Sequence, residues 1–166
     1  GQNANNRSFL PWMGTFHGIC VRLLRMDGQA IGIARNFVIY DEDDRQSLIK
    51  QAMKQLSISD REIKPSQASS TISTAKNEMR DPESYEAAVK YPYEKNIAKL
   101  YYRYEKMRRE AGALDFDDLL LDGVRLLRDV PELRDKWRTH FKHILIDEYQ
   151  DTNAAQYHLV KLLVND

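Results

Sequence analysis

One ten-residue string near the end of the chain constrains its fold more than any other feature of the sequence. Residues 144–146 are Ile-Leu-Ile, and two acids, Asp147 and Glu148, follow them directly. A short apolar run bounded in this way predicts a buried strand that ends in two carboxylates. In open α/β sheets, ligands bind at the carboxyl ends of the strands. The string therefore predicts a parallel sheet with an acidic pair at a ligand site.

The acidic pair and a nearby amide have side chains that suit nucleotide hydrolysis. Asp147 can hold Mg²⁺ through its water shell, and Glu148 can orient and deprotonate the attacking water. Gln150 is an amide that can sense a terminal phosphate. The alternative is a solvated strand end followed by capping residues, because 151–153 are Asp-Thr-Asn and an apolar helical pattern runs over 154–164.

The complete string ILIDEYQDTN at 144–153 resembles the Walker B motif of UvrD/Rep/PcrA-type superfamily 1 DNA helicases. Two other segments resemble motifs of the same family and occur in the same order, TFHG at 15–18 and LDFDDL at 114–119. The resemblance covers nearly the whole chain and is closest to the PcrA-like branch.

This resemblance implies the cofactors and the catalytic residues. Asp147, Glu148 and Gln150 would bind ATP and take part in its hydrolysis, with Asp147 and Glu148 as the metal-binding pair for Mg²⁺. In the intact protein, ATP binding would close two motor domains and hydrolysis would reopen them. Gln150 would link the γ-phosphate to the DNA track.

The resemblance also implies two places where DNA binds. Thr15 and His17 would contact phosphates of the single strand, and Phe16 would be a base-stacking or supporting residue. Without the resemblance, these residues would be interpreted as a core phenylalanine beside a hydrogen-bonded histidine. The helical subdomain of the family touches duplex DNA ahead of the fork, and Lys64 and Lys76 are our candidates for that contact.

The acids of the LDFDDL segment invite interpretation as a metal site, which we do not favour. Asp115 is placed as the N-cap of a following helix, and Asp117 and Asp118 lie in its first turn. Acids at a helix N-terminus interact favourably with the helix dipole, so a structural role explains most of the pattern.

The domain organisation is inferred from a motif that the sequence lacks. None of the seven glycines is followed by Lys-Ser or Lys-Thr, so the chain has no phosphate-cradling P-loop. The resemblance then implies an internal piece of a helicase, with parts of the first motor domain in residues 1–33 and 143–166 and a helical insert in 34–142. We expect a mainly α fold, in which strands of an incomplete parallel α/β, RecA-like motor domain flank the insert.

Apolar periodicity, prolines and capping residues predict the individual elements. We expect helices over about 42–56, 66–80, 92–111, 116–128, 131–141 and 154–164, a strand at 144–146, and weaker strands at 12–16 and 37–40.

Charge and composition limit the class of protein. Lys and Arg together number 25, as do Asp and Glu, so any contact with DNA must come from local patches. Cys20 is the single cysteine and is expected to be a buried thiol in a reducing compartment. The chain has no long apolar run and no signal-peptide pattern. With the resemblance, these features predict a bacterial, cytoplasmic, nucleoid-associated protein without a membrane partner.

The sequence thus predicts part of an ATP-dependent DNA helicase that translocates on single-stranded DNA and unwinds duplex in repair or replication. The chain alone is expected to be inactive, because the P-loop and the other parts of the helicase that complete the ATP site are missing. One alternative is a helicase-nuclease subunit of the same superfamily. The other is a non-catalytic module that binds nucleic acid or protein.

Overall fold

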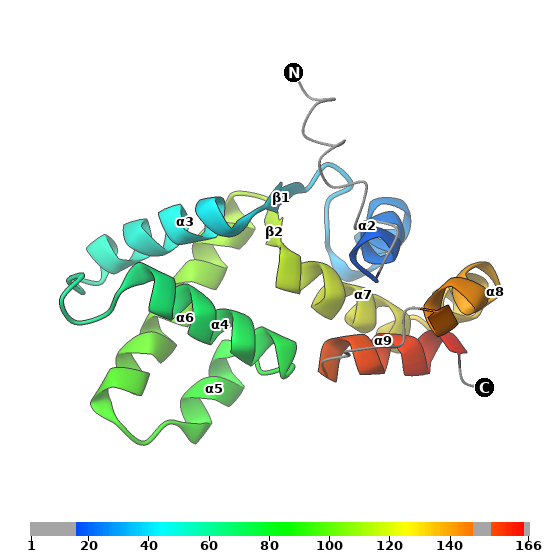
Figure 1. Ribbon diagram of the computed structural model, residues 1–166. Coiled ribbons are helices and arrows are strands. Elements are labelled where there is room, and N and C mark those ends of the chain that lie inside the picture. Colours follow the sequence, from blue (N-terminus) through cyan, green and yellow to red (C-terminus); the bar gives the residue numbers. More distant parts are fainter. Residues whose placement is uncertain (1–15, 148–153, 165–166) are drawn as a thin grey trace. The chain divides into compact units, whose positions relative to one another are not determined.

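The structure is a computed structural model that describes residues 16–147 and 154–164 (Figure 1). The chain divides into two compact units: unit 2 is Val38–Asp117, and unit 1 takes in the residues on both sides of it. The limits of the two units reflect how densely residues contact one another within each unit. The domain boundaries expected at 33/34 and 142/143 describe the organisation of the intact protein, and they stay a prediction.

Unit 2 is a helical body that begins and ends with a short strand. The strands are β1 (Val38–Tyr40) and β2 (Ala113–Asp115), and they pair in parallel, with Val38 opposite Ala113 and Tyr40 opposite Asp115. Between them lie, in chain order, α3 (Glu42–Gln55), α4 (Pro65–Asn77), α5 (Pro82–Ala88) and α6 (Pro92–Glu110). The chain therefore enters and leaves unit 2 through neighbouring strands.

Local sequence signals set the ends of these helices. The Asp41 side chain accepts a hydrogen bond from the Asp44 backbone N–H, and the Asp44 side chain accepts one from the Asp41 N–H, which forms a capping box at the start of α3. Proline is the first residue of α4, α5 and α6, where its missing N–H costs nothing. Gly112 follows α6 with a φ of 65°, a conformation that favours glycine.

The core of unit 2 confirms the apolar stripes expected for three helices. Its buried side chains come from α3 (Leu48, Ile49, Ala52, Met53), α4 (Ala68, Ile72, Ala75) and α6 (Ile97, Leu100, Tyr101, Tyr104), together with Ile63, which precedes α4. Two details were wrong. α4 ends at Asn77, so Met79 lies beyond it with a φ of 59°, and the short helix α5 was not expected.

Unit 1 is helical over its described residues. It contains α2 (Phe16–Asp27), the 3-10 turn η1 (Gly28–Ile31), α8 (Pro131–Asp147), α9 (Ala154–Val164) and the residues of α7 (Phe116–Asp129) from 118 onward. Apolar side chains of α2 and α7 are buried. No helix in these ranges is both long enough and apolar enough to cross a membrane.

The described residues confirm the mainly α fold and a small parallel sheet. The strand expected at 37–40 is present as β1, whereas residues 12–15 lie outside the described ranges and Phe16 already begins α2. The strand expected at 144–146 is wrong, because these residues continue α8 to Asp147.

The lack of strand partners explains that correction. A parallel strand needs hydrogen-bonding neighbours at its edges. The sheet formed by the described residues contains only β1 and β2, and neither pairs with 144–146. A helix instead satisfies its backbone groups within one segment.

A close approach of two helices gives the first test of this packing. A Cβ built on Gly123 of α7 would lie 2.7 Å from Sγ of Cys20, a fully buried residue of α2. We expect Gly123→Ala to lower the free energy of unfolding, because overpacking costs about 1–3 kcal/mol. With Cys20→Ala the Sγ is gone and the nearest atom is the Cβ of residue 20 at 3.3 Å, so Gly123→Ala should then cost clearly less than it does in the wild type. Urea unfolding of the four proteins would measure both effects; an equal cost in both backgrounds would contradict the clash with Sγ.

Candidate functional site

One of the three residues expected to act on the nucleotide, Asp147, is the last residue of α8. α8 ends at Asp147 and α9 begins at Ala154, as expected for a helix after the acidic string. Glu148 and Gln150 lie outside the described residues, as does the side chain of Asp147. Their roles remain predictions.

The residues expected on the single-strand path lie at the start of α2. Phe16 is its first residue and has only 4% of its surface exposed, so its ring is not open to a base in this structure. The supporting role fits this burial, and the stacking role does not. His17 is half-buried, and Thr15 lies outside the described residues.

The other end of α2 holds the segment that leads into unit 2. Nη1 of Arg25 donates hydrogen bonds to the carbonyl oxygens of Arg35 (2.8 Å) and Phe37 (2.6 Å). The Arg25 guanidinium also lies 3.8 Å from the centroid of the Phe37 ring. In return, Nε of Arg35 donates to the carbonyl oxygen of Arg25 at 3.2 Å. One helix therefore carries both the expected DNA residues and the anchor of the connecting segment.

Lys76 corrects one of the expected DNA contacts. Its side chain is 1% exposed, and its Nζ lies 2.7 Å from Oδ2 of Asp115 and 2.5 Å from Oε1 of Glu105. The same ammonium group lies 5.1 Å from the centroid of the Tyr104 ring. Carboxylates from other elements enclose Lys76, so it is not available to a DNA phosphate in this structure.

Asp115, at the end of β2, is the carboxylate on which several partners converge. It accepts hydrogen bonds from Nζ of Lys76 and from the hydroxyl of Tyr104, both at 2.7 Å. Burial alone would raise the pKa of Asp115, but the cations Lys76, Arg108 and Arg45 together hold it well below the ordinary range for an aspartate. Asp115 is therefore a fully charged, buried anion.

Glu105 and Arg108 extend the same group of charges along α6. Both side chains are buried and form an ion pair, and Nη1 of Arg108 also donates to the carbonyl oxygen of Ala113 at 2.7 Å. Burial raises the pKa of Glu105, while Lys76 and Arg108 lower it by more, so its net pKa is also depressed.

Arg45 of α3 closes the group from another side. Its Nη1 lies 2.6 Å from Oδ2 of Asp117, and its Nε donates to Oγ of Ser69 at 2.9 Å. We call the following six residues the ionic cluster: Arg45, Lys76, Glu105, Arg108, Asp115 and Asp117. These six residues are three cations and three carboxylates, and Glu42 of α3, which is more exposed, also pairs with Arg45 at 2.6 Å, so each buried carboxylate has a cationic partner. This supports a structural role for Asp115 and Asp117 rather than metal binding.

Lys64 remains a candidate for a DNA contact. It is exposed and stands directly before α4, and its side chain forms no capping hydrogen bond with that helix. Sequence periodicity does not separate Lys64 from Lys76, because the carboxylates that enclose Lys76 come from α6 and β2, far along the chain.

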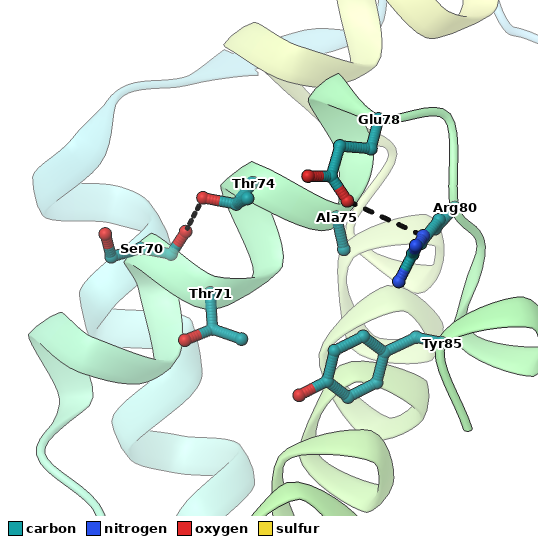
Figure 2. Close-up of a pocket in the computed structure, with 7 residues that line it drawn as sticks. All are labelled: Ser70, Thr71, Thr74, Ala75, Glu78, Arg80 and Tyr85. Atoms are coloured by element: carbon teal, nitrogen blue, oxygen red, sulfur yellow. Dashed lines mark hydrogen bonds and ion pairs between the residues drawn. The ribbon is translucent and has the colours of Figure 1, made fainter. Parts of the chain in front are cut away.

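A pocket of about 200 Å³ opens beside α4 (Figure 2). Its walls are Ser70, Thr71, Thr74, Ala75, Glu78, Arg80 and Tyr85. Nε of Arg80 lies 3.5 Å from Oε2 of Glu78, and Oγ1 of Thr74 donates to the carbonyl oxygen of Ser70. The charged pair neutralises itself, so the pocket offers no net positive charge to a phosphate, and we assign it no part in nucleotide binding.

Comparison with known proteins places these features in a family. Residues 2–166 match the family described as UvrD/REP helicase N-terminal domain. An ATP-dependent DNA helicase PcrA of Staphylococcus epidermidis is 42% identical over 154 residues, which are 93% of this chain and 21% of that protein. The ATP-dependent DNA helicase PcrA of Staphylococcus aureus is 41% identical over the same shares. The chain thus spans about a fifth of the length of these relatives.

The ionic cluster should be sensitive to loss of one partner. We expect Lys76→Met to lower the free energy of unfolding by about 3–5 kcal/mol, because it leaves Asp115 and Glu105 buried without their cation. Lys50→Met, at an exposed position of α3, is the matched control and should stay within about 0.5 kcal/mol of the wild type. In urea unfolding, Lys76→Met combined with Asp115→Asn should lose less than the sum of the single changes. Additive losses would show that the two residues do not interact.

The depressed pKa values of Asp115 and Glu105 predict loss of stability in acid. Their ordinary values are about 3.9 and 4.3. Because both folded-state pKa values are lower, their stabilisation is complete above the ordinary values and is lost as the pH falls below about 4. Urea midpoints measured from neutral pH into acid should show this fall, and Asp115→Asn should flatten it. Equal pH dependence in the two proteins would contradict the assignment.

Proposed function

Because the chain belongs to the UvrD/REP helicase family, we propose that it is part of an ATP-dependent DNA helicase that translocates on single-stranded DNA and unwinds duplex. The string at 144–153 carries this proposal, because it combines two adjacent acids, an amide and a helix start in the order that the Walker B motif requires. The match over residues 2–166 supports it along the whole chain.

The proposed nucleotide chemistry assigns one task to each side chain. Asp147 and Glu148 are adjacent carboxylates, a donor set that suits the hard cation Mg²⁺, and Asp147 would hold it through water. When bound, Mg²⁺ neutralises charge on the ATP phosphates. Glu148 takes the proton of the attacking water, and Gln150 contacts the terminal phosphate. The chain has no P-loop to hold ATP, so by itself it should not turn ATP over.

The proposed DNA track begins at the N-terminus of α2. Thr15 and His17 contact phosphates there, where backbone N–H groups also favour an anion, and Phe16 supports them from the core. Lys64 contributes to the duplex contact of unit 2. Arg25 then joins the helix of the DNA track to the segment that enters unit 2.

The cellular setting is also proposed by similarity. The relatives are DNA helicases of bacteria, and we place this protein in bacterial DNA repair or replication, in the cytoplasm and associated with the nucleoid. Its partners are ATP, single-stranded and duplex DNA, and the other parts of the same helicase.

The role of Glu148 can be tested in the intact parent protein. Glu148→Gln keeps the size of the side chain and removes the base, so it should spare ATP binding but lower DNA-stimulated hydrolysis by about 10²–10⁴-fold. Asp147→Ala should instead weaken the Mg²⁺-dependent binding of ATP. Steady-state ATPase rates and equilibrium nucleotide binding would separate these effects. Near-normal turnover of Glu148→Gln at saturating ATP would show that Glu148 is not the base.

A further inference from the structure

The exposed surface of α6 has only one sign of charge over most of its length. Between residues 95 and 109, the exposed side chains of this helix are Lys95, Lys99, Tyr102, Lys106 and Arg109. Three acids of α6 lie in or next to this stretch. Glu94 is half-buried, Glu105 is buried in the ionic cluster, and Glu110, the last residue of the helix, is exposed just beyond the stretch.

The neighbouring helix α3 continues this surface. From residue 47 to 55, its exposed side chains are Ser47, Lys50, Gln51, Lys54 and Gln55, with no acid among them. α3 packs on α6, and Nη1 of Arg103 donates to Oε1 of Gln55 at 2.7 Å. We call the following five residues the α3–α6 basic face: Lys54, Lys95, Lys99, Arg103 and Lys106.

The lysines of this face are not used to hold the fold together. Within the residues that the structure describes, no carboxylate lies within ion-pairing distance of Lys54, Lys95, Lys99 or Lys106. The contrast with Lys76 is direct, since that lysine is buried between two carboxylates. The exposed lysines therefore keep their charge available to a partner.

Helix energetics do not explain the choice of Lys95, Lys99 and Arg103. Lys95, Lys99 and Arg103 follow one another at intervals of four, and like charges at that spacing destabilise a helix. Lys95 also lies near the N-terminus of α6, where the helix dipole favours an acid. A face that stabilised only its own helix would mix the two signs, so the series of cations indicates an anionic partner.

We propose that the α3–α6 basic face binds the phosphate backbone of DNA. The rise of about 1.5 Å per residue puts Lys95 and Lys106 about 16 Å apart along α6, which is the length of about five phosphates on one strand of a duplex. Lysines act as point charges without base readout, so this binding is independent of sequence. The face is separate from Lys64 and from α2, and the proposal deepens the DNA-binding part of the proposed function on which it rests.

Fluorescence anisotropy of this chain with a short labelled oligonucleotide, single-stranded or duplex, tests the proposal. At low salt we expect dissociation constants of about 10⁻⁴ to 10⁻⁶ M. Lys99→Gln combined with Lys106→Gln removes two phosphate contacts. The slope of log affinity against log salt, between about 50 and 200 mM, should shrink by about 1.8 on duplex or about 1.4 on single strands. The DNA form that shows this loss is the one that the face contacts.

A matched pair of changes controls for loss of charge alone. Arg80→Gln combined with Lys90→Gln also removes two exposed cations from unit 2, but these residues flank the acidic helix α5. This control should keep the wild-type slope. Circular dichroism should show unchanged folding in both variants, because no ion pair of the described residues involves Lys90, Lys99 or Lys106, and the pair of Arg80 with Glu78 is exposed to solvent.

Three outcomes would overturn the proposal. If the wild type binds DNA and the Lys99/Lys106 variant binds with the same slope, the face is not the contact, while the proposed helicase function stands. If polyglutamate competes as well as DNA at equal charge, the partner is an acidic protein. If the wild type binds neither form of DNA at low salt, both this face and the duplex contact proposed for unit 2 fail, and the Glu148→Gln test then decides the motor assignment alone.

Discussion

The charge of Asp115, buried at the end of β2, is the constraint on which unit 2 depends. It is an anion with only 1% of its surface exposed, and Lys76 of α4, Tyr104 of α6 and Arg45 of α3 contact it. A buried carboxylate is costly unless its partners are in place, so the three helices must meet β2 in one arrangement. Apolar contacts between the same helices would tolerate small shifts. The apolar core thus makes packing of the helices favourable, and the ionic cluster determines the one arrangement in which they pack.

The cluster also explains how a chain with no net charge can present a basic surface. The buried charged side chains of unit 2 pair with one another in the ionic cluster. Its exposed charged side chains are not evenly mixed, because cations lie together on the α3–α6 basic face. Glu105 belongs to the ionic cluster, although it lies on the same helix as Lys99 and Lys106. Because Glu105 is buried and Glu94 is half-buried, the exposed charged side chains of α6 between residues 95 and 109 are all cations, and an exposed acid follows only at Glu110, its last residue. Net charge therefore says little about which polymer such a domain binds.

Sequence reasoning succeeded where the cause was local. The ranges of α3 and α6, expected at about 42–56 and 92–111, depend on capping residues, prolines and apolar residues a few positions apart, and the structure has them close to those bounds. It failed where the cause lay far along the chain. Lys76 is enclosed by carboxylates 29 and 39 residues away, which no periodicity reveals. A strand at 144–146 likewise depends on partner strands, and the described residues provide none. Of the candidate site, the pattern predicted the residue types, while their geometry at 148–150 lies outside the described residues.

The parallel pairing of β1 with β2 has a consequence for how such proteins change over time. Paired strands lie about 4.8 Å apart, and because β1 and β2 are parallel the chain enters β1 and leaves β2 in the same direction, so the spacing of entry and exit is fixed whatever lies between them. The rest of the protein meets the same pair of ends whether the intervening polypeptide is long or short. The polypeptide between β1 and β2 can therefore become longer or shorter, or be exchanged, without a change in the backbone geometry of these two strands. The surface of unit 2 can therefore change in sequence while the motifs at 15–18 and 144–153, which lie outside this unit, stay as they are.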